Sequence, residues 1–87
     1  MPKVEKEIEI LNAQGLHARP AAMFVQIASK FDSQLTVTKD NESVNGKSIM
    51  GILMLGAQQY SRIKVTAEGE DAAQLVQELE EFLSKPE

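Results

Sequence analysis

The sequence contains no cysteine and no tryptophan, and only one histidine and one tyrosine occur among its 87 residues. The absence of cysteine excludes disulfide bonds, thiolate zinc sites and thiol nucleophiles, and it is compatible with a reducing compartment. Any nucleophilic chemistry must therefore use another side chain. The single histidine, His17, is the first candidate, because neutral imidazole is a good nucleophile near neutral pH.

The sequence also lacks a long apolar run and a stripe of basic residues. The first segment, MPKVEKEIEI, has a charge at nearly every second or third position, so it predicts neither a signal peptide nor a membrane span. We therefore expect a cytoplasmic protein without membrane insertion. The formal net charge of −4, with scattered lysines and arginines, argues against nucleic acid as the main partner and favours proteins.

Length and composition predict one globular domain over residues 1–87. Apolar residues make up 43% of the chain and charged residues 25%, which is typical of a folded domain. A chain of 87 residues is too short for two cores, yet it exceeds the length below which metals or disulfides are usually needed. We expect the fold to be stable without a metal or a cofactor.

Alternating apolar and polar residues predict four strands. The pattern covers Val4–Ile10 and Arg62–Ala67, and it indicates a hairpin between Leu35–Thr38 and Ser43–Asn45. Because one face of each strand is apolar, the sheet should be buried on one side only. The residues expected on the wet face are Glu5, Glu7, Glu9, Thr36, Thr38, Arg62 and Lys64.

Two helices are predicted before the last strand. Apolar residues at helical spacing run from Ala18 to about Lys30. A compact apolar stretch, Ile49–Leu55, follows Ser48 as a good N-cap and precedes Gly56, which can adopt the left-handed conformation of a helix end.

The last helix has the clearest apolar stripe, from Ala72 to Leu83. Asp71 and Gln74 have the spacing of a capping box at its start. The element order is thus βαββαβα. We predict an α+β fold, an open-faced two-layer sandwich in which three helices cover one face of a four-stranded sheet.

His17 lies where the first strand joins the first helix. If the helix starts at Ala18, His17 occupies the N-cap or the position beside it. Unpaired N–H groups of the first turn and the positive end of the helix dipole would then receive an anion attached to the imidazole. A phosphoryl group on an imidazole nitrogen remains easily transferable, which suits a carrier.

Three neighbours support this interpretation. Arg19 has a planar fork of donors that matches phosphate geometry. Pro20 fits the first helical turn without losing a hydrogen bond, and Gly15 permits a tight backbone close to the imidazole. The simpler alternatives are a solvent-exposed capping histidine and a surface arginine without a role in chemistry.

The segment Gly15-Leu16-His17-Ala18-Arg19-Pro20-Ala21 resembles the active-site motif of the HPr phosphocarriers of the bacterial phosphoenolpyruvate-dependent phosphotransferase system. Chain length, element order, Val44–Gly51 and Glu68-Gly69 also resemble this family. The resemblance implies an antiparallel sheet in the order 1-4-2-3. It also implies that His17 takes a phosphoryl group from enzyme I through Nδ1 and gives it to EIIA domains, while Arg19 neutralises the group and Gly15, Ala18 and Pro20 support the loop.

On this resemblance the protein is a monomeric carrier rather than an enzyme. It needs no cofactor, because phosphoenolpyruvate supplies the phosphoryl group through enzyme I. An independent hydrolase using His17 is a poor alternative, since so short a chain shows no second acid, base or metal cluster. The regulatory alternative is a nitrogen-branch relative (NPr) or a corepressor that reports metabolic state.

Ser48 resembles the family's regulatory serine, which HPr kinase/phosphorylase phosphorylates in many bacteria. This adds that kinase and a transcription regulator as partners. Sequence physics alone assigns Ser48 only as a helix cap. Ile49, Met50 and Leu53 either form an apolar docking patch near His17 or belong partly to the core.

Overall fold

Four strands and three helices follow one another in the predicted order. They are β1 (Lys3–Glu9), α1 (Ala18–Ser29), β2 (Gln34–Lys39), β3 (Glu42–Asn45), α2 (Ile49–Leu55), β4 (Arg62–Glu68) and α3 (Ala72–Leu83). The computed structural model describes residues 1–86. Predicted and observed boundaries differ by a residue or two; β1, for instance, ends at Glu9 rather than at Ile10, which is still buried.

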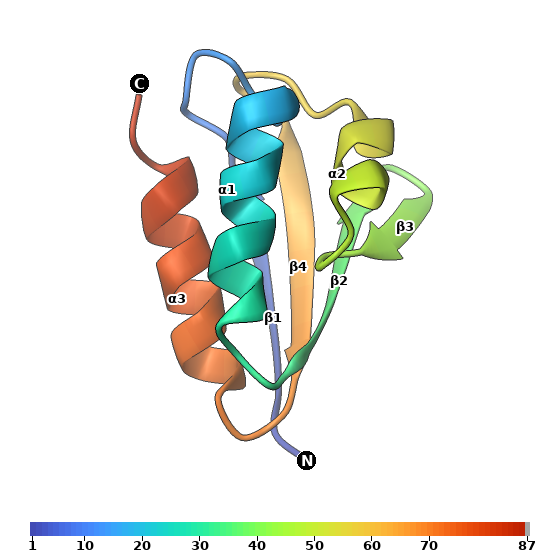
Figure 1. Cartoon of the computed structure of the whole chain (residues 1–87), viewed down its shortest axis with the longest axis vertical. Helices are drawn as coiled ribbons and strands as arrows, with labels where there is room; N and C mark the ends of the chain where they lie inside the picture. The colour runs from blue at the N-terminus through green and yellow to red at the C-terminus, as the bar shows by residue number, and fades with distance from the viewer. Residues whose placement is uncertain (87) are drawn as a thin grey trace.

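The strands form an antiparallel sheet in the order β1-β4-β2-β3, as the resemblance implied. The last strand in sequence, β4, lies inside the sheet and pairs with both β1 and β2. All three helices lie on one face of this sheet (Figure 1). The predicted α+β open-faced sandwich is therefore confirmed.

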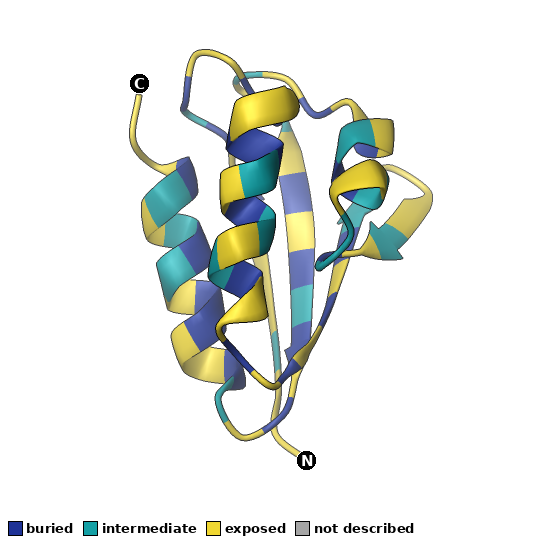
Figure 2. Cartoon of the chain, viewed as in Figure 1, coloured by how far each residue is buried: buried dark blue, intermediate teal, exposed yellow. Residues whose placement is uncertain are grey.

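The core lies between the sheet and the helices. Ile8 stands opposite Ile63 in the register of β1 and β4, and Val37 stands opposite Val65 in that of β2 and β4. All four side chains are buried. Along β4, buried residues alternate with exposed or half-buried ones (Figure 2). On the open face Glu5, Glu7, Glu9, Thr36, Arg62 and Lys64 are exposed as predicted, and Thr38 is half-buried.

Lys6 interrupts the apolar alternation of β1, and the structure explains why a charge is tolerated there. The alternation along β1 places Lys6 on the same side as Val4 and Ile8, toward the helices. Its Nζ lies 2.7 Å from a carboxylate oxygen of Glu80 on α3. Because both side chains are partly exposed, the ammonium group stays in contact with solvent while its stem packs beside α3. No helix within residues 1–86 is long and apolar enough to cross a membrane.

The predicted capping box at the start of α3 is wrong. Asp71 is the N-cap residue, but its carboxylate makes no hydrogen bond to its own helix. It accepts instead from the backbone N–H groups of Asp32, at 2.9 Å, and Ser33, at 3.0 Å, and from the Ser33 hydroxyl. These donors lie in the loop between α1 and β2, so Asp71 ties that loop to α3. Sequence spacing could not show the contact, because the partners are 38 and 39 positions apart.

These hydrogen bonds lower the pKa of Asp71 below its ordinary value of 3.8, first through the Ser33 hydroxyl and then through the Asp32 backbone. In the unfolded chain Asp71 binds its proton at higher pH than in the folded protein. The stabilisation is therefore complete above the unfolded pKa and is lost as the pH falls through the folded pKa.

We predict that Asp71→Asn lowers the melting temperature at pH 7 and that the difference from the parent protein shrinks below about pH 4. Thermal unfolding monitored by circular dichroism across this range measures the effect. Asp40→Asn is the matched control, because Asp40 is an exposed turn residue with φ of 55°, which asparagine adopts readily. A difference for Asp71→Asn that is independent of pH would contradict the assigned hydrogen bonds.

Candidate functional site

His17 is the N-cap of α1, as predicted. Its backbone is extended, with φ −81° and ψ −169°, and its side chain is exposed and makes no capping hydrogen bond. The first helical bond runs from the Ala21 N–H to the His17 carbonyl, at 2.7 Å. Within residues 1–86 the N–H groups of Ala18 and Arg19 have no partner, and Pro20 has no N–H. Two free donors thus stand at the helix start beside the imidazole.

Two hydrogen bonds between Asn12 and Gly15 close the turn before His17. The Gly15 N–H donates to the Asn12 carbonyl at 3.1 Å, and Asn12 Nδ2 donates to the Gly15 carbonyl at 2.7 Å. The Leu16 N–H then donates to the Ala57 carbonyl at 2.9 Å. Gly15 has φ of +63°, and a Cβ there would lie 2.5 Å from the Ala57 oxygen. Only glycine fits this backbone and this space.

The same loop is braced from the far end of the chain. The Leu11 N–H donates to the Leu83 carbonyl at 2.9 Å, and the Ala13 N–H donates to the Pro86 carbonyl at 3.1 Å. The Gln59 side chain donates to the Leu11 carbonyl at 3.1 Å. The entry to β4 and the end of α3 therefore both hold the segment that leads to His17. The sequence does not predict this brace, because backbone hydrogen bonds leave no trace in residue type.

His17 and Arg19 line two different crevices of comparable size. His17 shares a crevice of about 220 Å³ with Leu53 and Gly56 of the α2 segment, and Leu16, Ala18 and Gln58 complete it. Arg19 lines a crevice of about 220 Å³ whose other walls are Asn12, Gln14, Pro20, Met23 and Phe82. Within residues 1–86 the guanidinium makes no hydrogen bond or ion pair. The structure brings His17 to α2, whereas it turns Arg19 toward the loop and α3.

The residues expected to dock partners differ in exposure. Ile49 is 44% exposed and Met50 66%, while Leu53 is half-buried and packs against the core. Met54 was not predicted as a surface residue, because it lies inside a compact apolar stretch, yet its side chain is 74% exposed. We define Ile49, Met50 and Met54 as the α2 patch. Leu53 connects this patch to His17, because it also lines the His17 crevice.

Ser48 caps α2 as the sequence indicated. Its Oγ accepts the Gly51 N–H at 3.0 Å, and its carbonyl accepts the Ile52 N–H at 3.0 Å. The helix ends at Gly56, which has φ of 60°. Lys47, just before the cap, is half-buried and donates from Nζ to the Phe31 carbonyl at 2.6 Å. The start of α2 is therefore joined to the loop that follows α1.

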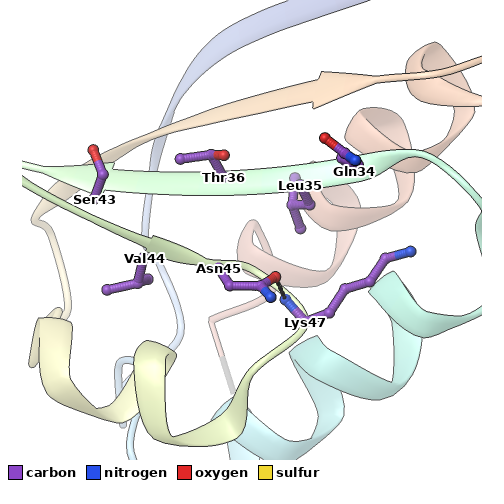
Figure 3. Close-up of a pocket in the computed structure, with 7 residues that line it drawn as sticks. All are labelled: Gln34, Leu35, Thr36, Ser43, Val44, Asn45 and Lys47. Carbon is purple, nitrogen blue, oxygen red and sulfur yellow. Dashed lines mark hydrogen bonds between the residues drawn. The ribbon is translucent and has the colours of Figure 1, made fainter.

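Two hollows on the sheet share no lining residue with the crevices at His17 and Arg19. One, of about 430 Å³, lies on the β2–β3 hairpin, where the Asn45 side chain accepts the Lys47 N–H at 2.9 Å (Figure 3). Another, of about 480 Å³, lies among charged residues of the open sheet face, including Glu7, Arg62 and Lys64. Within the part of the chain that the structure describes, no three side chains of the metal-binding types His, Cys, Asp and Glu are grouped to hold an ion.

Comparison with known proteins places the chain in one family. The family described as "PTS HPr component phosphorylation site" matches residues 4–85. The HPr-like protein Crh of Halalkalibacterium halodurans is 43% identical over 82 residues, which cover 94% of this chain and 98% of the relative. The phosphocarrier protein HPr of Neisseria meningitidis is 42% identical over 81 residues, which cover 93% and 91%.

Solved structures agree with this relationship. The phosphocarrier HPr of Bacillus anthracis superposes with a TM-score of 0.92 at 40% identity, covering 95% of this chain and 99% of that one. HPr-C-His of Thermoanaerobacter tengcongensis gives a TM-score of 0.86 at 53% identity, covering 95% and 91%. Crh of Bacillus subtilis, described as a swapped dimer, gives 0.74 at 38% identity, covering 92% of each chain.

We predict that Gly15→Ala lowers the free energy of unfolding by about 2 to 4 kcal/mol, because a left-handed backbone and a close contact act together. Gly56→Ala is the matched control. Its φ of +60° is similar, but no atom lies within 4 Å of the added Cβ, so only the backbone cost of about 1 kcal/mol applies. Urea unfolding compares the two variants, and equal losses would contradict the close packing of Gly15 on Ala57.

Proposed function

Because the chain belongs to the HPr phosphocarrier family, we propose that it accepts a phosphoryl group on His17 and passes it to a partner protein. One observation carries the assignment to this residue. The only histidine of the sequence is exposed at the N-cap of α1, beside the unpartnered N–H groups of Ala18 and Arg19. An oxyanion attached to the imidazole would lie where these donors and the helix dipole favour negative charge.

The transfer is a displacement at phosphorus. A ring nitrogen of neutral His17 attacks with its lone pair, the bond between phosphorus and phosphorylated enzyme I breaks, and a P–N bond to His17 forms. In the second step a nucleophile of an EIIA domain attacks the same phosphorus, and His17 leaves as imidazole. Phosphoenolpyruvate is the source of the phosphoryl group through enzyme I, so we propose no cofactor and no metal for this chain.

Arg19 is proposed to neutralise the phosphoryl group. Its guanidinium is exposed and free of ion pairs within residues 1–86, so no competing carboxylate has to be displaced. A planar fork of donors suits phosphate oxygens better than a lysine ammonium would. Gly15, Ala18 and Pro20 contribute through the backbone, since they set where the helix begins and which N–H groups are free.

We propose that enzyme I and EIIA dock on the α2 patch and Leu53. Ile49 and Met50 are exposed apolar side chains, and Leu53 extends the surface to the crevice at His17. Flexible methionine side chains adapt to more than one partner surface. A carrier that must meet a donor and an acceptor in turn needs such an adaptable surface, and a monomer in the cytoplasm leaves it free for both.

A regulatory role is the second candidate. Relatives include Crh, described as the catabolite repression HPr of Bacillus subtilis. Ser48 holds α2 through its cap, so phosphorylation by HPr kinase/phosphorylase would place a dianion directly beside the α2 patch. The product would favour a transcription regulator over enzyme I as partner. A nitrogen-branch role would use the same His17 chemistry with different partners.

We predict that incubation with enzyme I and phosphoenolpyruvate adds one acid-labile, base-stable phosphoryl group to His17. Intact-mass measurement detects the adduct, and peptide mapping locates it. His17→Ala should stay unlabelled while keeping its melting temperature, because the exposed ring makes no hydrogen bond to its helix. An unchanged mass for the parent protein, or equal labelling of His17→Ala, would contradict the proposed function.

Arg19→Ala should slow phosphoryl transfer roughly tenfold or more, because a charge-assisted contact to the phosphoryl group is lost. The melting temperature should hardly change, since the guanidinium makes no ion pair within residues 1–86. Rapid-quench transfer from phosphorylated enzyme I measures the rate. Arg62→Ala, on the open sheet face, is the control for general loss of positive charge. Equal rates for the two variants would refute the role.

Phosphorylation of Ser48 should inhibit charging of His17 while the fold stays intact. The added charge of about −1.5 to −2 is tolerated at a helix start but opposes a partner that must desolvate the neighbouring patch. We would compare transfer rates and melting temperatures of the parent, Ser48→Ala and Ser48→Asp at two salt concentrations. An unchanged rate of phosphoryl transfer to Ser48→Asp would contradict inhibition by the added charge. A large fall in the melting temperature of Ser48→Asp would mean that Ser48 acts only as a helix cap.

A further inference from the structure

All four methionines of the sequence lie on the surface of the protein. Their side chains are 90% exposed at Met1, 45% at Met23, 66% at Met50 and 74% at Met54. The core within residues 1–86 is built instead from alanine, valine, leucine, isoleucine and phenylalanine. Since the sequence has no cysteine, the four thioethers hold all of its sulfur, and solvent reaches each of these side chains.

Two of these methionines share one face of α2. Met50 and Met54 are four positions apart, so one helical turn separates them and both belong to the α2 patch. Leu53, the neighbour of Met54, packs against the core and lines the crevice at His17. The two exposed thioethers therefore lie on the helix that borders the proposed phosphorylation site.

The other two methionines lie elsewhere. Met23 is on α1 and lines the crevice of Arg19 rather than that of His17. Met1 is at the N-terminus, which lies at the opposite end of the molecule from the start of α1 (Figure 1). The chain thus provides its own reference residues, with the same side chain outside the α2 patch.

We propose that Met50 and Met54 are a site of reversible oxidation by peroxides, and that the sulfoxide form slows phosphoryl transfer to His17. The effect on transfer rests on the proposed function, whereas the oxidation itself does not. No thiol in this chain competes for the peroxide, because the sequence has no cysteine.

The reaction balances with a hydroperoxide as the oxidant. A lone pair of the methionine sulfur attacks one oxygen of hydrogen peroxide, the O–O bond breaks and an S–O bond forms. The sulfide is oxidised to a sulfoxide, and the peroxide is reduced to water. A thiol-dependent methionine sulfoxide reductase reverses the change: two thiols are oxidised to a disulfide, and the sulfoxide is reduced to the sulfide while its oxygen leaves as water.

A sulfoxide opposes docking on an apolar patch. It adds a polar oxygen that a partner must desolvate, and it replaces a flexible apolar side chain that adapts to different partners. The fold itself should tolerate the change, because both side chains are exposed and the core holds no methionine. The cap of α2, from Gly51 N–H to Ser48 Oγ, involves neither sulfur atom.

The first test needs no phosphoryl transfer. The parent protein is treated with hydrogen peroxide at pH 7, and peptide mapping by mass spectrometry follows the added oxygen at each methionine over time. We expect Met50 and Met54 to be oxidised roughly twofold or more faster than Met23, and the reductase with a thiol to restore the original mass. Slower oxidation of this pair than of Met23, or a large fall in melting temperature on oxidation, would overturn the proposal.

The second test measures transfer from phosphorylated enzyme I before and after peroxide treatment of each protein. Excess peroxide is removed before enzyme I is added, so only the HPr-type chain is oxidised. Transfer to the parent protein should slow roughly tenfold and recover after treatment with the reductase. The double variant Met50→Leu/Met54→Leu should keep its own untreated rate, because leucine has no sulfur. Met23→Leu, the matched control, should slow by the same factor as the parent.

The outcomes separate the two parts of the proposal. Equal slowing of the double variant and the parent would overturn the assignment to Met50 and Met54. Unchanged transfer to a parent protein oxidised at both residues would overturn the effect on docking, and recovery by the reductase tests this effect without any substitution. If the untreated parent accepts no phosphoryl group, the proposed function fails, while the mass mapping still decides whether this pair is the oxidation site.

Discussion

The position of the first helix depends on one tight backbone contact. Gly15, in a left-handed conformation, lets the chain pass close to the Ala57 carbonyl, and the next N–H bonds to that carbonyl. This contact joins the loop after β1 to the loop before β4, whose strands are neighbours in the sheet. The place where α1 starts, and hence the place of His17, follows from a feature of the backbone rather than from any side chain of the site.

The loop before His17 is held by hydrogen bonds, whereas the start of α1 is open to solvent, and the proposed transfer uses both properties. Backbone bonds to Leu83 and Pro86 hold the segment before His17, so the proposed transfer would require little further ordering of this loop. The imidazole, the Arg19 guanidinium and the free N–H groups remain accessible because no element of residues 1–86 covers them. The proposed docking surface is separate from this site, since α2 presents Met50 and Met54 while Leu53 links them to the His17 crevice.

Sequence patterns predicted the fold and the location of His17 well, because alternation and helical spacing report directly on burial. They also identified Ser48 as a cap and Gly56 as a helix end, since these positions have strong residue preferences. The capping box at Asp71 was wrong, because a carboxylate bonds to whichever donors the tertiary fold brings nearest. The exposure of Met54 was missed, as an apolar run in a short helix does not reveal which side meets solvent.

The proposed function requires the start of α1 to bind the phosphoryl group through its own backbone N–H groups. Amide NMR spectra of the protein before and after charging by enzyme I and phosphoenolpyruvate test this most directly. We predict that the N–H signals of Ala18 and Arg19 move downfield and exchange more slowly in the phosphorylated protein, while the buried amides of β4 hardly change. Unchanged Ala18 and Arg19 signals in a fully phosphorylated protein would contradict it.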